Sequence, residues 1–599
     1  MTVYDGKSRE PGVPAAAKSW ALELVILFDI YQAPDTLGRW SHGIMTLFDH
    51  RFRLWLAALI AVFSMLSHQA VASGYDQLLS LSQDWRGFVP PPITQCVPDY
   101  GAAAIKAKAT GLKAYRQRLS AIDRTGWTPS QSVDYRVIEA EMQGLDFDLR
   151  ILRPWARDPT FYATLFDEES DVPVHEGSSA EPQIDLFAYS YPLSDADQKR
   201  LTCLIGAIPA LLNQAKINLA GSNTRDLWLY GARAFREQSR MLAALEAGTL
   251  TMRTLSGPNH GSLDGVGAAL RQAVHQARDA TDKFQGWVTA EAPSKTGPSG
   301  VGKENYNWYE KNVHLVPFDW DSQATLLQRE LDRALAALRL EELHNQAEPP
   351  LAPHDDGAAW PAFSAAKMQR LTDFLIHSGI VPDRPYFRDA MARQALGYTP
   401  PDQRNFFGHG IARDPLGLYS HDYHWIELAR LKFEPNPSPI RRLPILWDMF
   451  DTRSEGLATA MEELLLQAGL YDGDPRGREI VWCMLANRAA RGLASLYVQA
   501  NQMSLAEAGQ FHAHWTPRGW SDPSSDLVAF EQLLYLRQPG YGTSYVIGKL
   551  QFDHLIALAS HQAETDGREF SVSGFFERFN QAGILPFSLI EIEMAGGRN

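Results

Sequence analysis

The sequence predicts an all-α fold built as a single large helical domain, and three observations support this. Apolar residues recur at spacings of three and four along most of the chain after residue 75, and alternating strand patterns are scarce. Interruptions rich in Pro and Gly are too short to separate domains. The 599 residues are 45% hydrophobic, which is ample for one buried core. We therefore expect one helical domain over residues 73–599.

Three stretches show the helical spacing most clearly, and three others show loop composition. The predicted helices are 201–212, 457–465 and 477–502. Gly469 follows the second of them in the position of a C-terminal cap. The predicted loops, where Pro and Gly gather, are 291–303, 348–361 and 434–444.

The first 72 residues are expected to lie outside this domain. Residues 1–44 are predicted to be a poorly ordered extension, and Met45 is a candidate start codon. Residues 45–72 have the three parts of a secretory signal peptide: Arg51 and Arg53, the apolar stretch 54–66, and Ala70-Val71-Ala72 as a cleavage site.

The apolar stretch 54–66 distinguishes a signal peptide from a membrane anchor. It is 13 residues long, and a helix needs about 20 to span a bilayer. We therefore expect cleavage near Ser73, a secreted or periplasmic protein, and no stable membrane anchor after cleavage.

Composition excludes some classes of partner. There are 56 Lys and Arg against 70 Asp and Glu, a formal charge of -14, and no dense basic run, so no nucleic-acid partner is expected. The three cysteines include no CxxC pair, and at most one disulfide can form. Cys203 and Cys483 lie in apolar helical patterns and are predicted to be buried free thiols.

Residues 297–304 nearly match a phosphate-binding P-loop, but two features oppose nucleotide binding. Glu304 stands where the motif needs Ser or Thr to hold magnesium. The segment also follows a helical stretch and a Pro-containing loop rather than an apolar strand. We expect no nucleotide to bind here.

Histidines and carboxylates gather on one predicted helix that runs to Phe433. At about 100° per residue, His421, His424 and Glu427 share one face of this helix, and Asp422 points to the other side. A second helix, after the Pro-rich loop, presents Glu455. Imidazoles and carboxylates from two facing helices suit zinc first, and manganese or iron next. The predicted metal ligands are His421, His424, Glu427 and Glu455.

The same side chains have a second interpretation without chemistry. They are also what a buried salt-bridge network would use, with Arg430, Arg441 and Arg453 as neighbours. Ion-pair networks and active sites perturb charges alike, and spacing does not separate the two.

Several short motifs together carry a family resemblance that spans most of the chain after residue 73. They are Asp134-Tyr135, Pro154-Trp155, Asp158-Pro159, Gly302 with Tyr306, Glu455-Gly456-Leu457-Ala458, Gly469-Leu470-Tyr471, Ala489-Ala490-Arg491, and Pro539-Gly540 with Tyr545 and Gly548. With these motifs the chain resembles the domain-of-unknown-function 885 family, mostly bacterial and often exported proteins similar to helical gluzincin-type metallopeptidases. The resemblance implies a zincin-like helical peptidase architecture with a central cleft.

The family's metal motif is altered in this chain. The family pattern is His-Glu-x-x-Pro-Gly-His with a later Glu-Gly-Trp-Ala-Leu-Tyr, in which the histidines and the later Glu bind metal and the first Glu activates water. The matching positions are His421 for the first His, Asp422 for the Glu, Trp425-Ile426 for Pro-Gly, Glu427 for the second His, Glu455 for the later Glu, and Ser495 and Gln499 for a further Asp and His. His424 could replace the lost histidine if the helix stays straight without Pro-Gly.

Two functions are compatible with these residues. The first is an exported metal-dependent hydrolase of peptides or peptide-like amides, with Asp422 or Glu462 as base. Its predicted substrate contacts are Arg453, Trp425 and Tyr545. The second is a metal-free, non-catalytic descendant that binds a peptide or saccharide in an aromatic-lined cleft. The aromatic residues proposed for that cleft are Trp425, Trp447, Trp515, Trp520 and Tyr545.

Overall fold

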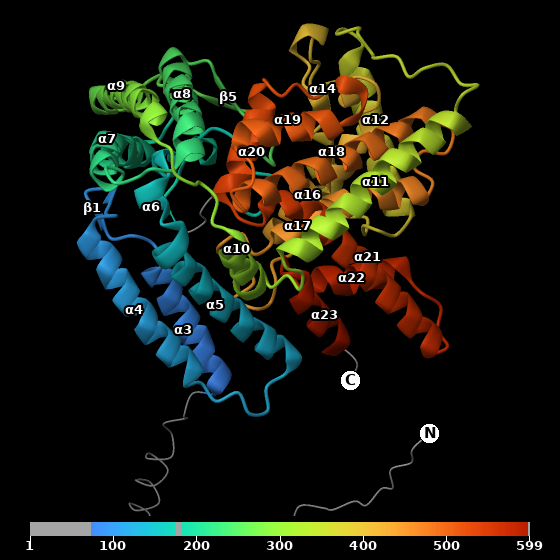
Figure 1. Ribbon diagram of the computed structural model, residues 1–599, viewed down its shortest axis with the longest axis horizontal. Coiled ribbons are helices and arrows are strands. Elements are labelled where there is room, and N and C mark those ends of the chain that lie inside the picture. The colour runs from blue at the N-terminus through green and yellow to red at the C-terminus, as the bar shows by residue number, and fades with distance from the viewer. Residues whose placement is uncertain (1–72, 175–180, 597–599) are drawn as a thin grey trace, which may run out of the picture. The chain divides into compact units, whose positions relative to one another are not determined.

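The computed structural model describes residues 73–174 and 181–596 (Figure 1). Within them the chain is predominantly helical, as predicted, and from Ser73 onward it forms one compact unit. The predicted extension 1–44 and signal peptide 45–72 lie outside the described residues. No helix in the described part of the chain is long and apolar enough to cross a membrane.

Three amino-terminal helices pack against one another and lead into a π-helical turn. They are α3 (Gly74–Phe88), α4 (Ala102–Ser120) and α5 (Pro129–Phe147), followed by the π-helix η3 (Asp148–Leu152) and by α6 (Pro154–Arg157). Their packing is anchored by Trp85, which is fully buried and donates a hydrogen bond from Nε1 to Glu141 (2.8 Å).

The next three long helices enclose a hydrophobic core of their own. These are α7 (Asp195–Asn218), α8 (Arg225–Ala247) and α9 (Ala268–Glu291), with the short strand pairs β3 (Leu165–Phe166) and β4 (Ile184–Asp185), and β5 (Leu250–Met252) and β6 (Asn259–Gly261), beside them. Figure 1 shows these three helices in green. We call them the α7–α9 layer.

A disulfide ties this layer to the hairpin of β1 (Ile93–Thr94) and β2 (Val97–Pro98). Cys96, between the two strands, is bonded to Cys203 on α7. The prediction of a free thiol at Cys203 is therefore wrong, because helical periodicity carries no information about a hairpin 107 residues away. Cys483 is a buried free thiol, as predicted.

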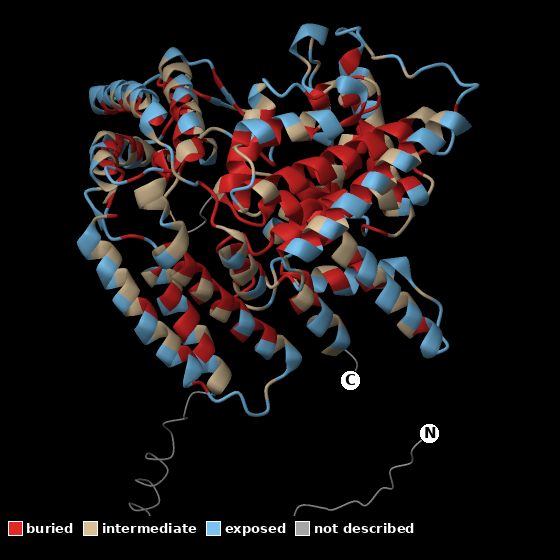
Figure 2. Ribbon diagram, in the orientation of Figure 1, coloured by how far each residue is buried: buried red, intermediate tan, exposed pale blue. Residues whose placement is uncertain are grey.

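The remaining helices build the largest core and carry the site. They are α10 (Lys303–Tyr309), α11 (Trp320–His344), α12 (Trp360–His377), α13 (Pro385–Ala392), α14 (Phe406–Ile411), α15 (Leu416–His421), α16 (Tyr423–Phe433), α17 (Asp451–Gln467), α18 (Pro475–Gln499), α19 (Leu505–Trp515), α20 (Asp526–Arg537), α21 (Tyr541–Thr565), α22 (Val572–Gln581) and α23 (Phe587–Gly596). A second π-helix, η7 (Glu310–His314), follows α10. Figure 2 shows how strongly buried residues concentrate in the middle of this region.

The predicted helices and loops agree with the structure. The stretches 201–212 and 457–465 fall within α7 and α17. The stretch 477–502 falls on α18 but extends three residues beyond its last residue, Gln499. Gly469 lies just after α17 with a φ of 99°. The positive φ explains why glycine stands at that cap. The P-loop-like segment 297–304 follows a 3-10 turn rather than a strand. The Lys303 ammonium lies 2.9 Å from an Asp321 carboxylate oxygen.

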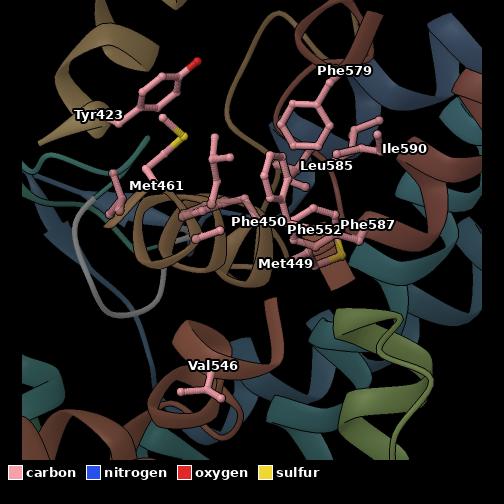
Figure 3. Close-up of a cluster of buried hydrophobic side chains, with 14 of the residues drawn as sticks. Tyr423, Met449, Phe450, Met461, Val546, Phe552, Phe579, Leu585, Phe587 and Ile590 are labelled. Carbon is pink, nitrogen blue, oxygen red and sulfur yellow. The ribbon is translucent and has the colours of Figure 1, made fainter. Parts of the chain in front are cut away.

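Helices α17 and α21 make the most extensive helix–helix contact in the described chain. Gly456 and Gly548 face each other where the two backbones cross, and a Cβ atom at either position would overlap the opposite backbone. Figure 3 shows a cluster of buried hydrophobic side chains that includes Phe450, just before α17, and Phe552 on α21. The close approach fixes Glu455, next to Gly456, against the first turns of α21.

Candidate metal site

Three side chains from two neighbouring regions converge on a group able to hold a metal ion. His421, His424 and Glu455 each offer one ligand atom, and these atoms lie within 4.8 Å of one another. The Nε2 atoms of His421 and His424 lie 3.3 and 3.4 Å from Oε2 of Glu455. Among the described residues this is the only such group of three His, Cys, Asp or Glu. We call it the triad.

A break between two short helices brings the two histidines together. Helix α15 ends at His421 and α16 begins at Tyr423, with Asp422 between them at ψ 4°. The predicted continuous helix from His421 to Phe433 is therefore wrong. The Asp422 N–H donates to both Leu418 O (3.2 Å) and Tyr419 O (3.1 Å), which is the tighter geometry of a 3-10 turn. As a result the His421 and His424 rings lie 4.9 Å apart and nearly perpendicular.

Glu427 does not join the triad. Its Oε1 lies 2.5 Å from an Arg453 guanidinium nitrogen, and Arg453 also donates to Asn580 and lies over the Phe579 ring. Arg453 is only 1% exposed and does not line the cavity described below. The predicted metal ligand Glu427 and the predicted substrate contact Arg453 thus form a buried ion pair, as the salt-bridge interpretation expected for these two.

His421 is oriented from behind by a charged pair. Its Nδ1 lies 3.1 Å from Glu462 Oε1 and 3.1 Å from an Arg488 nitrogen, and Glu462 and Arg488 are hydrogen-bonded to each other. A carboxylate on Nδ1 fixes the ring and leaves Nε2 to face a metal. Glu462 was predicted as a candidate base; its position behind His421 instead fits a positioning residue.

Aromatic hydroxyl and ring contacts complete the surroundings. The Tyr541 hydroxyl donates to Glu455 Oε1 (2.5 Å), which leaves Oε2 toward the histidines. Tyr545 stacks on the His421 ring at 6.0 Å and 14°. Tyr545, predicted to contact substrate, therefore supports a triad residue from the side and does not line the cavity.

The electrostatics of the triad follow from burial and close contact. Burial acts to lower the pKa of His424, but its contact with Glu455 raises that pKa to about 9. Burial acts to raise the pKa of Glu455, and its contacts with His421 and His424 hold it well below the ordinary value. Without a metal ion, His424 and Glu455 thus form an ion pair at neutral pH.

Asp422 is a buried carboxylate beside the triad. Burial raises its pKa to about 7, against the opposing effect of the Arg253 guanidinium. Its Oδ2 makes no hydrogen bond to any described residue. A carboxylate with a pKa near neutrality can accept and return a proton, which is the property a general base needs.

A cavity of about 540 Å³ is lined by residues close in sequence to the triad, although His421, His424 and Glu455 are not part of its wall. Its wall includes Trp425, next to His424, and Asp451, four residues before Glu455 on α17. Arg253 also lines it and lies over the Trp425 ring at 4.7 Å. Trp425 and Trp447 thus occupy the position expected of aromatic ligand contacts, whereas Trp515 and Trp520 are not part of the wall.

Sequence reasoning missed Arg488, Tyr541 and Arg253. A detectable pattern existed for the first, since Arg488 and Arg491 interrupt an otherwise apolar helix and both are buried. The family positions at Ser495 and Gln499 bond to backbone atoms instead of to a metal site: Ser495 donates to Gly492 O, and Gln499 to Tyr535 O and Leu536 O.

Comparison with known proteins finds similarity in the fold alone. No family model matches the chain, and no curated protein sequence matches it. A protein of unknown function from Shewanella oneidensis, predicted to be a lipoprotein, has a similar structure, with a TM-score of 0.62 and 13% identity over 88% of this chain and 100% of that one. A predicted lipoprotein from Colwellia psychrerythraea is similar at a TM-score of 0.57, with the same identity and coverage. The family resemblance therefore stays a prediction.

Proposed function

We propose that this protein is an exported metal-dependent hydrolase of peptides or peptide-like amides. The observation that carries the proposal is the triad, in which two imidazole nitrogens and one carboxylate oxygen lie within 4.8 Å of one another. Trp425 and Asp451, close to the triad along the chain, line a cavity of about 540 Å³. Two histidines and a glutamate, with room for a further ligand, are the donor set of catalytic zinc sites.

The donor set fits a divalent cation, zinc first and manganese or iron next. When bound, the ion would act as a Lewis acid and lower the pKa of water. His421 and His424 would hold it through Nε2 and Glu455 through Oε2, while Glu462 and Tyr541 keep two of these side chains in place. Asp422 is the residue available to take up a proton, and Trp425, which lines the cavity, would contact the substrate.

Metal binding tests the proposal directly. Purified protein should take up one zinc ion per chain, and His424→Ala and Glu455→Ala should each weaken binding at least 100-fold because each removes a ligand atom. Calorimetry and elemental analysis provide the measurement. Glu462→Gln should weaken binding about 10- to 100-fold, since it acts only through the orientation of His421.

His409→Ala is the matched control, because His409 stacks on Trp520 away from the triad. Asp422→Asn should keep the metal and lose turnover of peptide substrates. Wild-type protein that binds no zinc, manganese or iron would rule out the hydrolase.

One observation favours a second candidate, the metal-free binding protein. The charges of Glu455 and His424 compensate each other, so the triad needs no metal ion to balance the charge of its carboxylate. In that case added zinc would leave the melting temperature unchanged, whereas a bound ion at 1,000 times its Kd would stabilise the fold by about 4 kcal/mol.

Export rests on independent support. The Cys96–Cys203 disulfide is typical of oxidising compartments, and both structural neighbours are predicted lipoproteins. Residues 45–72 contain no cysteine for a lipid thioether, so we expect release after cleavage rather than a lipid anchor. Protein from its native host should begin near Ser73 and contain one free thiol; an intact 54–66 segment would contradict this.

A further inference from the structure

One end of the cavity is built from carboxylates and aromatic rings. Asp148, Asp448 and Asp451 line it together with Tyr309 and Trp447, and we call this set the acidic end. All three carboxylates are buried. The Trp447 Nε1 donates to Asp148 (2.7 Å), and the Tyr309 hydroxyl donates to Trp447 O (3.5 Å), so these side chains form one connected group.

The cavity as a whole is negatively charged. Ten carboxylates line it against four arginines. Arg240, Arg537 and Arg233 are paired with Asp167, Asp158 and Glu237, and Arg253 is bonded to Gln394. Carboxylates therefore outnumber guanidinium groups in the described wall of the cavity.

The Tyr309 phenol and the Asp148 carboxyl both register this charge. Burial, followed by Asp148, Asp448 and Asp451, raises the pKa of Tyr309 well above its ordinary value. Burial raises the pKa of Asp148 to about 8, and the Glu181 carboxylate adds to the increase. Both shifts would be relieved by a cation placed among these groups.

A second, independent feature indicates that a ligand enters here. The Gln538 side chain is 8% exposed and lines the cavity, yet neither its Oε1 nor its Nε2 has a hydrogen-bond partner among the described residues. A buried amide without partners is rare in proteins and costs about 1–3 kcal/mol. A ligand with polar groups of its own would satisfy it.

The acidic end is suited to an organic cation rather than a metal ion. Its carboxylates do not form a group with ligand atoms within 4.8 Å, since among the described residues only the triad does so. A guanidinium or ammonium group can contact carboxylates that are farther apart, and it is attracted to aromatic faces such as those of Tyr309 and Trp447.

The acidic end lies beside the triad. Asp451 and Glu455 are four residues apart on α17, so they share one face of the helix about 6 Å apart along its axis. Gln538 is three residues before Tyr541, whose hydroxyl donates to Glu455. A group bound at the acidic end would thus be close to any bond held at the triad.

Resting on the hydrolase function above, we propose that the acidic end binds a positively charged side chain, arginine or lysine, of the substrate peptide next to the bond that is cleaved. A bound cation lowers the pKa of Asp148, so that Asp148, Asp448 and Asp451 together balance its charge. Tyr309 and Trp447 contact its apolar stem, and Gln538 hydrogen-bonds to the peptide. The specificity of the enzyme is therefore for basic peptides.

Binding to metal-free protein tests this separately from catalysis. Four blocked tripeptides, acetyl-Ala-X-Ala-amide with X as Arg, Lys, Glu or Leu, would be titrated by calorimetry into the full chain in EDTA. The Arg and Lys peptides should bind at least 10-fold more tightly than the Glu and Leu peptides. Equal affinities, or a preference for Glu or Leu, would overturn the proposal whatever the metal result.

Variants locate the site within the cavity. Asp148→Asn and Gln538→Leu should each weaken binding of the Arg peptide about 3- to 10-fold. Asp167→Asn, whose carboxylate is paired with Arg240, is the matched control and should change it less than 2-fold. Circular dichroism and melting temperature verify that each variant is folded. An effect at Asp167 as large as at Asp148 would contradict a defined acidic end.

A titration with agmatine tests whether the acidic end recognises a peptide or any small organic cation. Agmatine carries the guanidinium without a peptide backbone and should bind at least 10-fold more weakly than the Arg peptide. If it binds as tightly, the peptide part of the proposal is wrong. A preference for basic peptides in protein that binds no metal would retain the acidic end and reject only the hydrolase.

Discussion

The α7–α9 layer and the helices around the triad each enclose a buried core, but the two cores contain different kinds of side chain. The core of the α7–α9 layer consists of apolar side chains such as Phe235, Leu242 and Phe284. It also contains the uncharged pair Gln238 and Thr281, which hydrogen-bond to each other. Helix α17 buries most of its length, and the buried residues include Asp451, Arg453, Glu455 and Glu462. Charged groups are expensive to bury. Their concentration around α17 makes this region, rather than the α7–α9 layer, the candidate site.

The comparison also separates two ways in which a helix pair is fixed. Apolar side chains can repack after a substitution. The α17–α21 crossing cannot, because Gly456 and Gly548 leave no room for a Cβ atom. The first arrangement gives stability, and the second gives the positional precision that the triad needs.

The largest expected effect is at the buried ion pair of α16 and α17. Arg453→Met should lower the free energy of unfolding by about 3–5 kcal/mol, because it leaves the Glu427 carboxylate buried without its partner. Urea unfolding followed by circular dichroism gives the value. The double variant Arg453→Met with Glu427→Leu should recover most of the loss, and a double variant as unstable as the single one would show that the pair itself is not responsible.

A somewhat smaller loss is expected in the apolar layer. Leu242→Ala should lower the free energy of unfolding by about 3 kcal/mol through the cavity it leaves. Leu242→Met is the control and should cost less than about 1.5 kcal/mol. Zinc affinity should stay unchanged in both variants; a change in it would mean that the layer and the triad are coupled.

The smallest effect, counted per pH unit, is the dependence of stability on pH that arises from Asp148. Its pKa is raised to about 8 in the folded chain, so the folded state holds a proton that the unfolded state releases above about pH 4. Wild-type stability should therefore fall between about pH 4 and 8, by at most about 1.4 kcal/mol per pH unit from this group. Asp148→Asn removes that contribution and should gain stability relative to wild type as the pH rises.

Urea unfolding at pH 5, 6, 7 and 8 measures the trend. Asp146→Asn is the control, because that carboxylate is paired with Arg150 at 2.6 Å near the surface, and its difference from wild type should stay constant with pH. A parallel trend in both variants would locate the pH dependence elsewhere.

The sequence by itself determined the all-α class, the positions of α7, α17 and α18, the glycine cap after α17, and three residues of the triad. All of these follow from local periodicity and from residue types at short spacing, which depend only on residues close together in the sequence. His424 lies beside His421 and Glu455, as the replacement-ligand hypothesis requires, but the helix is not straight there, because it breaks at Asp422.

Only the tertiary structure decided the rest. The pairing of Glu427 with Arg453, the bond between Cys96 and Cys203, and the support of His421 by Arg488 join residues 26 to 107 positions apart. The acidic end draws on residues from Asp148 to Asp451. Such contacts depend on which helix faces pack together, and a periodic pattern shows that a face is buried without showing what lies opposite it.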